Sequence, residues 1–358
     1  MHWNLNMGYE PSEPVYVRTD VCVRLGENVT CDGFDPNCQI RIQTHAHYDH
    51  LKEFSSSKSN QRMIVMTRPT MDLLVVEGEI DLPSRNNVII LEADGKENDV
   101  LGTKIALYPF CHMIGSVMPL VRSSSGAEVY AYSSDFSWPL TITPPKVDVL
   151  VVDALYGNPA NIRDYNDQDA IDGLIEIIND MVPHGPVYIR GHRGRLQFVC
   201  ALVKERYPQP IILGPNAARS IHVFCKHQGI DIKTLEMESA EATSLLRDGG
   251  NCFVFLEERD KNPIIGSTPR RRIWLTRFSL AHEPAVIEYD SGLVKVGLTD
   301  HADFEGTIKL IQCMDPKLVF ANGARGGDNE ALANYVRNEL GLEARWEAVR
   351  KSEHGWGE

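Results

Sequence analysis

The chain has 358 residues, 43% of them hydrophobic, which is enough for one large or two medium-sized domains with their own cores. No apolar run reaches the length of about 20 residues that a membrane-spanning helix needs, so the sequence predicts no membrane span. The net charge of −13 argues against a uniformly basic nucleic-acid-binding surface. The charge is unevenly distributed, however. Residues 154–292 carry 16 Lys and Arg against 18 Asp and Glu, a net charge of −2, and the rest of the chain carries −11.

The cysteines and the first residues bear on the compartment. Eight cysteines are spread along the chain without a CxxC pair or a dense framework, which favours free thiols in a reducing environment. The first residues lack the basic start and the apolar core of a signal peptide. The sequence therefore predicts a cytoplasmic protein.

The first segment that predicts chemistry is 44–50, which reads THAHYDH and follows a predicted meander of short strands. His45 and His47 are two positions apart and can point the same way. Asp49 and His50 are offset from them and can serve a second ion. Imidazole nitrogen and carboxylate oxygen are the ligands that Zn²⁺ takes in open, catalytic sites. The turn therefore predicts a metal site at the tip of a strand.

Between this turn and residue 160, apolar strands alternate with polar segments. We expect a loop at 55–60, a helix over 69–76, and strands at 63–66, 88–91, 104–108, 128–132 and 147–152. His112, Asp135 and Asp153 each follow one of the later strands. Functional groups gather on loops at such strand ends, so these three side chains are candidates for the same site.

From about residue 160 the pattern changes to alternating helices and strands. Helices are predicted over 169–182, 196–203 and 217–227, and strands at 186–190, 210–213 and 252–256. Short connections between alternating strands and helices predict a parallel α/β unit, which we place as a second domain over 154–292.

Strand patterns return after Pro284. Strands are predicted at 285–289, 293–298, 317–321 and 344–346, and helices over 306–314 and 329–340. His301 lies in the segment LTDHADFEG, residues 298–306, directly after one of these strands. It is a further candidate for the site.

The sequence resembles the β-CASP nucleases of the metallo-β-lactamase superfamily, and among them the short prokaryotic exonucleases of the DNA-ligase-associated and mRNA-3'-end-processing-factor-like kind. The motifs that carry the resemblance are THAHYDH at 44–50, CHMIGS at 111–116, YSSDF at 132–136, VDALYG at 152–157, GRLQ at 194–197 and LTDHADFEG at 298–306. They run across nearly the whole chain. The resemblance implies an α/β fold in which 1–153 and 293–358 form a metallo-β-lactamase αββα sandwich and 154–292 is the inserted β-CASP α/β domain.

The resemblance also implies roles for the matched residues. His45, His47 and His112 would hold the first metal ion, Asp49 and His50 the second, and Asp135 would bridge the two. A hydroxide bridging the two ions would be the nucleophile, with Asp49 part of the catalytic set. His301 would be the general acid and Asp153 would orient it. The ions would be two divalent metals, Zn²⁺ by preference, that activate water and clamp a phosphate.

One position departs from the pattern of the RNA-processing members, which carry another histidine after the strand that follows DHAD. Asn322 stands there in this sequence. It is a neutral, weaker ligand for a metal or a phosphate, so the second site is expected to bind loosely or to accept Mn²⁺. DNA-processing members also lack that histidine.

Several residues are candidates for nucleic-acid binding. Arg190, Arg193 and Arg195 follow a strand and open a helix, an arrangement that suits phosphate. Residues 270–272 (Arg270, Arg271 and Arg272) lie close to Trp274, and arginine beside an aromatic plane can hold a single strand and stack a base. Ser116, in the turn after His112, completes the candidates. Solvated charge at a helix start or beside a core tryptophan is the structural alternative.

The leading hypothesis is an enzyme, a metal-dependent two-metal phosphodiesterase that acts as an exonuclease on single-stranded DNA or RNA. Its partners would be nucleic acid, as a single strand or a free end, and proteins of DNA repair or RNA processing. Two alternatives stay open: a lactonase or thioesterase of the same superfamily, and a non-catalytic β-CASP scaffold.

Overall fold

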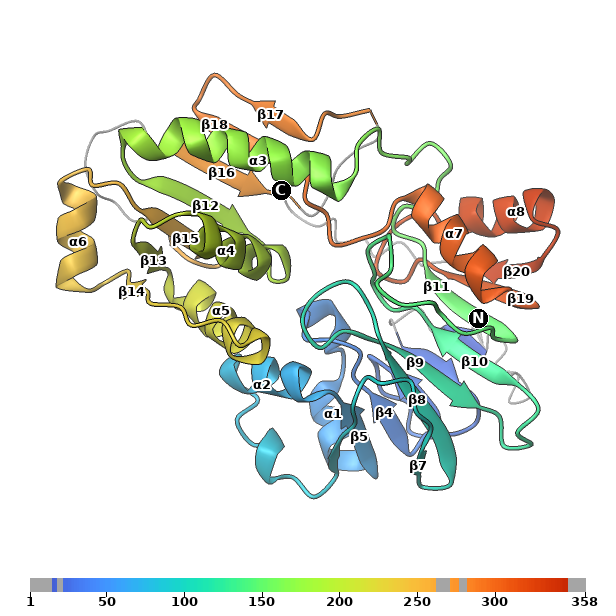
Figure 1. Ribbon diagram of the computed structural model, residues 1–358. Coiled ribbons are helices and arrows are strands. Elements are labelled where there is room, and N and C mark those ends of the chain that lie inside the picture. Colours follow the sequence, from blue (N-terminus) through green and yellow to red (C-terminus); the bar gives the residue numbers. More distant parts are fainter. Residues whose placement is uncertain (1–14, 18–21, 262–270, 277–281, 347–358) are drawn as a thin grey trace, which may run out of the picture.

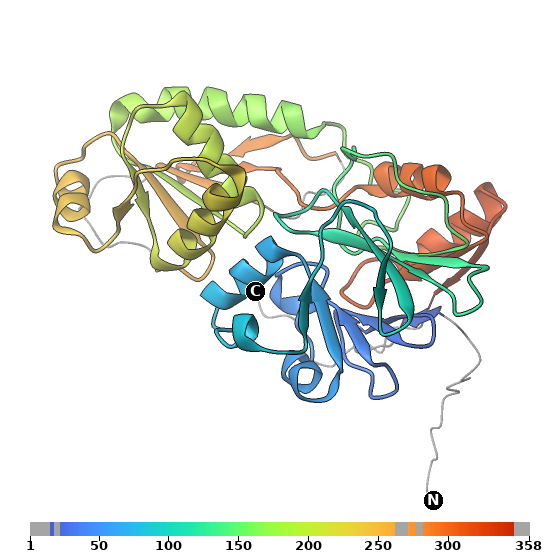
Figure 2. The same ribbon diagram turned by 60° about the horizontal axis from the view of Figure 1, so that its bottom comes forward.

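The computed structural model describes residues 15–17, 22–261, 271–276 and 282–346. The chain is an α/β protein with three sheets and, within those residues, eight α-helices. Two sheets lie together in one lobe, and the third sheet forms a second lobe beside it (Figures 1 and 2). None of the helices in the described ranges is long and apolar enough to cross a membrane.

The first lobe contains two sheets built from both ends of the chain. The first sheet has the order β1-β2-β3-β4-β5-β6, with strands β1 (Val15–Val17), β2 (Val23–Leu25), β3 (Val29–Cys31), β4 (Ile40–Ile42), β5 (Met63–Met66) and β6 (Val88–Ile90). The second has the order β20-β19-β11-β10-β9-β8-β7, with strands β7 (Asn98–Val100), β8 (Thr103–Pro109), β9 (Val117–Arg122), β10 (Val129–Tyr132), β11 (Val149–Asp153), β19 (Leu318–Asn322) and β20 (Glu343–Trp346). The parallel pairing of β11 with β19 joins the two halves of this lobe across the intervening segment.

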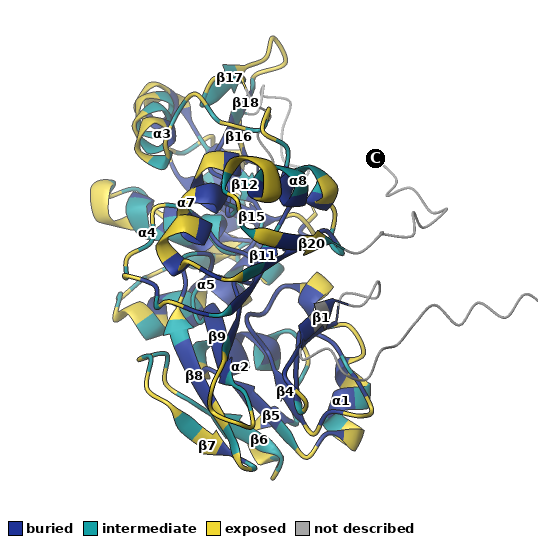
Figure 3. Cartoon of the chain, turned by 90° about the vertical axis from the view of Figure 1, so that its right-hand side faces the viewer, coloured by how far each residue is buried: buried dark blue, intermediate teal, exposed yellow. Residues whose placement is uncertain are grey.

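Helices cover the outer faces of these two sheets, which gives four layers. The helices of this lobe are α1 (Phe54–Asn60), α2 (Arg68–Val76), α7 (Phe304–Met314) and α8 (Asn329–Glu339), with short 3-10 turns at Tyr48–His50 and Leu82–Ser84. On β11, Val149 and Val151 pack into the core between the sheets. Leu150 and Val152 pack against α7 and α8 on the other face. Alternate strand residues face opposite sides, so the apolar run of β11 is buried on both (Figure 3).

The second lobe is a mostly parallel sheet with helices on both faces. Its order is β14-β13-β15-β12-β16-β18-β17, with β12 (Val187–Gly191), β13 (Ile211–Leu213), β14 (Leu235–Glu236), β15 (Phe253–Glu257), β16 (Arg271–Leu275), β17 (Val286–Glu288) and β18 (Leu293–Val296). Its helices are α3 (Asp167–Met181), α4 (Arg195–Arg206), α5 (Pro215–Gln228) and α6 (Ala240–Arg247), with a 3-10 turn at Val182–His184. Apolar residues of α3, α4 and α5 share one core with the sheet, and α6 packs on the other face.

The third sheet extends past the boundary that the sequence predicted at residue 292. β18 begins at Leu293 and pairs with β16 and β17. Its residues Val294 and Val296 belong to the core of the second lobe. The chain therefore returns to the first lobe after Val296 and not at residue 292. The sequence did not show this, because the pattern of a single strand does not reveal which sheet the strand joins.

The segment predicted as a loop at 55–60 is instead part of the helix α1. Its serines are weak helix formers, but tertiary contacts outweigh that preference. Phe54 and Ser57, three positions apart, are both buried on one face of the helix. The buried guanidinium of Arg41 donates to Ser57 Oγ at 3.0 Å and lies 4.9 Å from the Phe54 ring centroid. A long-range contact thus stabilises a helix that local propensity does not predict.

The two lobes meet where α2 lies beside α5 (Figure 1). Asp72 on α2 accepts hydrogen bonds from Lys226 Nζ at 3.1 Å and His227 Nε2 at 3.0 Å on α5. This contact holds the second lobe close to the segment that follows the His-rich turn.

Candidate metal centre

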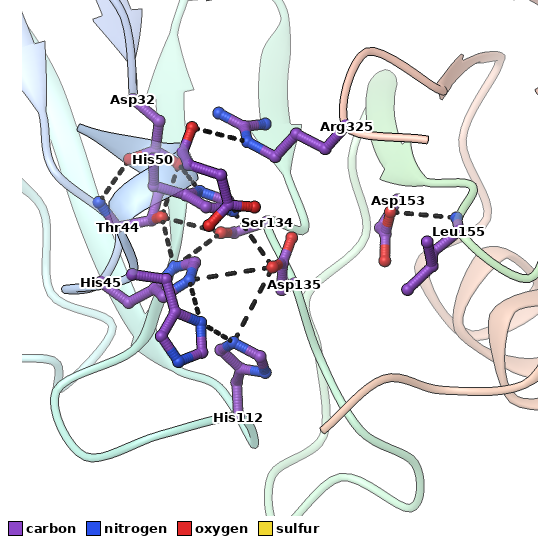
Figure 4. Close-up of polar contacts among 12 residues, drawn as sticks. Asp32, Thr44, His45, His50, His112, Ser134, Asp135, Asp153, Leu155 and Arg325 are labelled. Atoms are coloured by element: carbon purple, nitrogen blue, oxygen red, sulfur yellow. Dashed lines mark hydrogen bonds and ion pairs between the residues drawn. The ribbon is translucent and has the colours of Figure 1, made fainter. Parts of the chain in front are cut away.

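Four side chains that the sequence predicted around one ion converge in the structure. His45, His47, His112 and Asp135 each bring one donor atom within 4.8 Å of the others. His47 Nδ1 lies 3.2 Å from His45 Nε2 and 2.9 Å from His112 Nε2. Asp135 Oδ2 lies 3.8 Å from both His45 Nε2 and His112 Nε2 (Figure 4). Ligands about 2.0–2.1 Å from a tetrahedral Zn²⁺ stand roughly 3.3 Å apart, so the donor set fits one ion.

Backbone carbonyls fix which nitrogen of two imidazoles faces the cluster. His47 Nε2 lies 3.2 Å from the carbonyl oxygen of Arg193, and His112 Nδ1 lies 2.8 Å from that of Asp300. A carbonyl oxygen only accepts, so these two nitrogens carry the hydrogen. His47 Nδ1 and His112 Nε2 are thereby left with a free lone pair for a metal ion. The Arg193 carbonyl comes from the second lobe, which makes that lobe part of the site.

The charge state of the cluster suits metal binding. Burial lowers the pKa of His45 and His47 well below the usual value and lowers the pKa of His112 to about 4. Burial alone would raise the pKa of Asp135, but His50 and the other imidazoles outweigh it and hold that pKa well below its usual value. Neutral imidazoles beside an ionised carboxylate are the forms that bind a divalent ion.

Asp49, His50 and Asp135 form a second group, whose donor atoms also lie within 4.8 Å of one another. His50 Nε2 lies 3.1 Å from Asp135 Oδ2 and 3.9 Å from Asp49 Oδ2. Burial lowers the pKa of His50, but the carboxylates of Asp135, Asp32 and Asp49 outweigh it and raise that pKa to about 9. Asp135 therefore adjoins both groups, and the structure brings together all six residues predicted as ligands.

Asp32 is a buried member of the site that the sequence did not reveal. Its Oδ2 lies 2.7 Å from His50 Nδ1 and 2.6 Å from Thr44 Oγ1, and its Oδ1 accepts the Thr44 N–H at 2.9 Å. Burial raises the pKa of Asp32, but His50 outweighs it, so that pKa lies below its usual value. Asp32 holds His50 so that Nε2 faces the second group. Its one signal in the sequence is its place at the tip of a strand, before Gly33.

Replacing Asp32 with Asn should weaken metal binding at the second group. The Asn side chain keeps the shape but removes the negative charge that orients His50 and raises its basicity. Such outer partners typically account for about 10- to 100-fold in metal affinity or activity. Metal affinity measured by calorimetry would check this, with the exposed Asp94→Asn as a matched control. An unchanged second affinity would contradict the role given to Asp32.

His301 faces the cluster from the opposite side. Its Nδ1 lies 3.1 Å from Asp153 Oδ2, and its Nε2 lies 4.0 Å from Asp135 Oδ2. Burial lowers the pKa of His301, but the hydrogen bond to Asp153 and the neighbouring carboxylates outweigh it and raise that pKa to about 9. At neutral pH the imidazole therefore carries a proton at Nε2, directed at the cluster. The neighbouring Asp300 has its pKa raised to about 7 by burial, against the effect of Arg195.

The three arginines predicted to meet phosphate, which lie between the end of β12 and the start of α4, make contacts within the chain. Arg190 donates to the carbonyl oxygens of Glu257 at 2.7 Å and Asp260 at 2.9 Å. Arg193 is buried, with Nε 3.1 Å from Glu257 Oε1. Arg195 pairs with Asp300 at 2.7 Å. These contacts position the second lobe against the cluster, and a role in nucleic-acid binding stays a prediction.

The remaining candidates are spread over the two lobes. Arg270 lies outside the described residues, Arg271 Nη1 donates to the Met181 carbonyl at 2.8 Å, and Arg272 is exposed. The buried Ser116 accepts the Met113 N–H at 3.1 Å, and the buried Asn322 accepts the Ala324 N–H at 3.1 Å through Oδ1. Ser116 and Asn322 thus each stabilise a turn next to the site.

Comparison with known proteins gives three findings. No protein-family model matches the chain. Over 103 residues the chain is 32% identical to an Acidianus ambivalens protein described as "Uncharacterized protein in lig 3'region", a match that covers 28% of this chain and 72% of that protein. The fold is similar to the "Crystal Structure of a Protein of Unknown Function from Enterococcus faecalis V583", with a TM-score of 0.60 and 16% identity over 88% of this chain and 81% of that one. At this identity the second likeness shows the fold alone.

Fold and site together define an α/β protein with a histidine and aspartate cluster that could hold metal ions. The chain belongs to the same family as the Acidianus ambivalens protein.

Proposed function

We propose that the chain is a metal-dependent phosphodiesterase of the β-CASP branch of the metallo-β-lactamase superfamily that hydrolyses single-stranded nucleic acid. The observation that carries the proposal is the position of Asp135. Its Oδ2 lies 3.1 Å from His50, 3.8 Å from both His45 and His112, and 4.0 Å from His301. One carboxylate thus joins two candidate metal groups to a protonated histidine, which is the set of parts that phosphodiester hydrolysis needs. The four-layer first lobe and the α/β second lobe agree with this branch.

In this proposal some residues of the site bind the metal ions and others transfer a proton. Divalent ions, when bound, lower the pKa of water and neutralise charge on a phosphate. His45, His47 and His112 would hold one ion, and Asp49 with His50 a second, with Asp135 shared. His301 would give its Nε2 proton to the leaving oxygen, while Asp153 accepts at Nδ1 and stabilises the charged imidazole.

The place of the cluster between the lobes favours a single strand or free end as substrate. The carbonyl of Arg193, from the second lobe, contacts His47, so the second lobe closes over one side of the site. The description of the Acidianus ambivalens protein places it in a lig 3' region, which is compatible with work beside a DNA ligase in repair. RNA processing is the other setting that the motifs allow.

Digestion of end-labelled single-stranded DNA and RNA with Zn²⁺ or Mn²⁺ tests this function. We expect cleavage by the wild type, a fall of roughly 10²- to 10⁴-fold for His301→Ala, since general acid catalysis contributes about that much, and a large loss for Asp49→Ala. The exposed His222→Ala on α5 is a matched control and should keep wild-type rates. Failure of the metal-loaded wild type to cut either polymer would overturn the proposal, and turnover of a thioester or lactone instead would favour the small-molecule hydrolase.

A further inference from the structure

An arginine reaches the second metal group from the segment in which the RNA-processing members of the resembled family carry a histidine ligand. Arg325 lies in the turn between β19 and α8, three residues after Asn322. Its Nε donates to the Asp49 carbonyl oxygen at 3.3 Å, and its Nη1 donates to the Tyr132 hydroxyl at 3.0 Å. In Figure 4 its side chain points toward the His50 end of the cluster and away from His112.

Tyr132, whose hydroxyl accepts the hydrogen bond from Arg325, is fixed in the core. Tyr132 ends the buried strand β10 and is 1% exposed. The Tyr132 hydroxyl and the Asp49 backbone thus both hold the guanidinium. Asp49 lies in the 3-10 turn Tyr48–His50, so Arg325 also holds the turn that presents two of the candidate ligands.

The charge of Arg325 acts on the same carboxylates that would bind a second ion. Arg325 interacts electrostatically with Asp32, Asp135 and Asp49. An arginine guanidinium stays protonated in proteins, so Arg325 is a permanent cation at this place. A divalent ion at the second group would be repelled by it, because like charges repel one another and do so more strongly when they are partly shielded from water.

Asn322, the other candidate in this turn, already uses its side-chain oxygen within the turn. Oδ1 accepts the Ala324 N–H at 3.1 Å. Among the described residues, the second group is formed by Asp49, His50 and Asp135. The group therefore has fewer imidazole donors than the first group and a cation beside it.

We propose that Arg325 is a positioning residue that fixes Asp49 and supplies a resident positive charge at the second group, so that the chain binds one divalent ion tightly and a second ion more weakly. This inference rests on the metal binding in the proposed function. Two features would then weaken the second site. It lacks a histidine ligand at Asn322, and the charge of Arg325 repels the ion. A guanidinium there would also neutralise part of the charge on a substrate phosphate.

Metal titration of the apoprotein tests the inference without any activity assay. Calorimetry with Zn²⁺ and with Mn²⁺ should show one tight and one weaker site in the wild type. Arg325→Gln removes the charge and should tighten the second site by on the order of tenfold or more, with the first affinity unchanged. Arg325→Lys keeps the charge and should keep the weak second site. Tyr132→Phe, which removes only the hydroxyl, should resemble Arg325→Lys.

The outcomes separate this inference from the proposed function. A wild type that binds no ion would overturn both. Two ions bound with equal affinity by the wild type would overturn the inference alone, as would a second affinity in Arg325→Gln that is unchanged or weaker. Circular dichroism and the first-site affinity show whether each variant is folded. If Arg325→Gln does not fold, equal affinities in the wild type would still overturn the inference.

Discussion

Replacing Asp135 with Asn is expected to lower nuclease activity by roughly 10³-fold or more, because bound metal supplies several kcal/mol of transition-state stabilisation and each 1.36 kcal/mol is tenfold in rate. The substitution also removes the negative charge that both candidate groups share. Asp135 is buried, and among the described residues it is the one carboxylate that lies within 4.0 Å of all four imidazoles, those of His45, His50, His112 and His301. No neighbouring carboxylate is placed to take over its position between the groups.

The measurement pairs kcat/KM on a labelled single strand with metal content determined by mass spectrometry. We expect the metal content of Asp135→Asn to fall together with its rate. Asp290→Asn, an exposed residue in the turn between β17 and β18, is the matched control and should change neither quantity. An Asp135→Asn protein that keeps its metal and its rate would show that the cluster is not the reaction centre.

The sequence predicted which candidate side chains lie together, because the pattern that reveals them is local. His45, His47, Asp49 and His50 lie within six positions, and His112 and Asp135 each follow a strand, so residue type and strand periodicity were enough to bring them together. The same periodicity predicted α3, α4 and α5 and the strands β12, β13, β15, β17 and β18 of the second lobe, but not β14, α6 or β16. These features depend on near neighbours in the chain.

The partners that orient the ligands could not be predicted in this way. Asp32 contacts His50 from 18 positions away, and no histidine stands near it in the sequence. Arg193 looks like a phosphate ligand at a helix start, yet it is buried against Glu257. Arg325 stood in a segment that reads only as a glycine-rich turn. Each of these roles arises from the docking of distant segments, which periodicity does not encode.

Replacing Arg193 with Met is expected to destabilise the fold by about 3–5 kcal/mol near neutral pH, the range found when one partner of a buried ion pair is removed. Arg193 is 1% exposed and lies between two carboxylates, with Nε 3.1 Å from Glu257 Oε1 and Nη1 3.6 Å from Glu77 Oε1. Arg259 also pairs with both carboxylates, at 2.8 Å and 2.7 Å, and it stays in the variant. One cation would then face two buried anions, between α2 of the first lobe and β15 of the second.

The loss of folding stability in Arg193→Met should be larger at higher pH. Burial already raises the pKa of Glu257, whereas for Glu77 the opposing effect of Arg193 and other partners outweighs burial and lowers the pKa. Without Arg193 we expect both carboxyl groups to hold their protons to a higher pH in the folded state than the value of about 4.3 in the unfolded chain. A folded state that binds more protons loses stability as pH rises. Urea unfolding should therefore show a smaller loss at about pH 5 than at about pH 7.5.

A variant that also lacks the two buried anions separates the loss of charge balance from the loss of packing. Adding Glu77→Gln and Glu257→Gln to Arg193→Met removes both anions and leaves Arg259, whose side chain is 41% exposed, as the one charge of the set. Removing buried ionic partners together is often close to neutral for stability. We expect this triple variant to regain much of the stability and to lose the pH dependence, while the exposed Arg206→Met on α4 should stay near the wild type. A triple variant as unstable as Arg193→Met would mean that the guanidinium acts through its packing on the Tyr48 ring, 4.6 Å away, rather than through its charge.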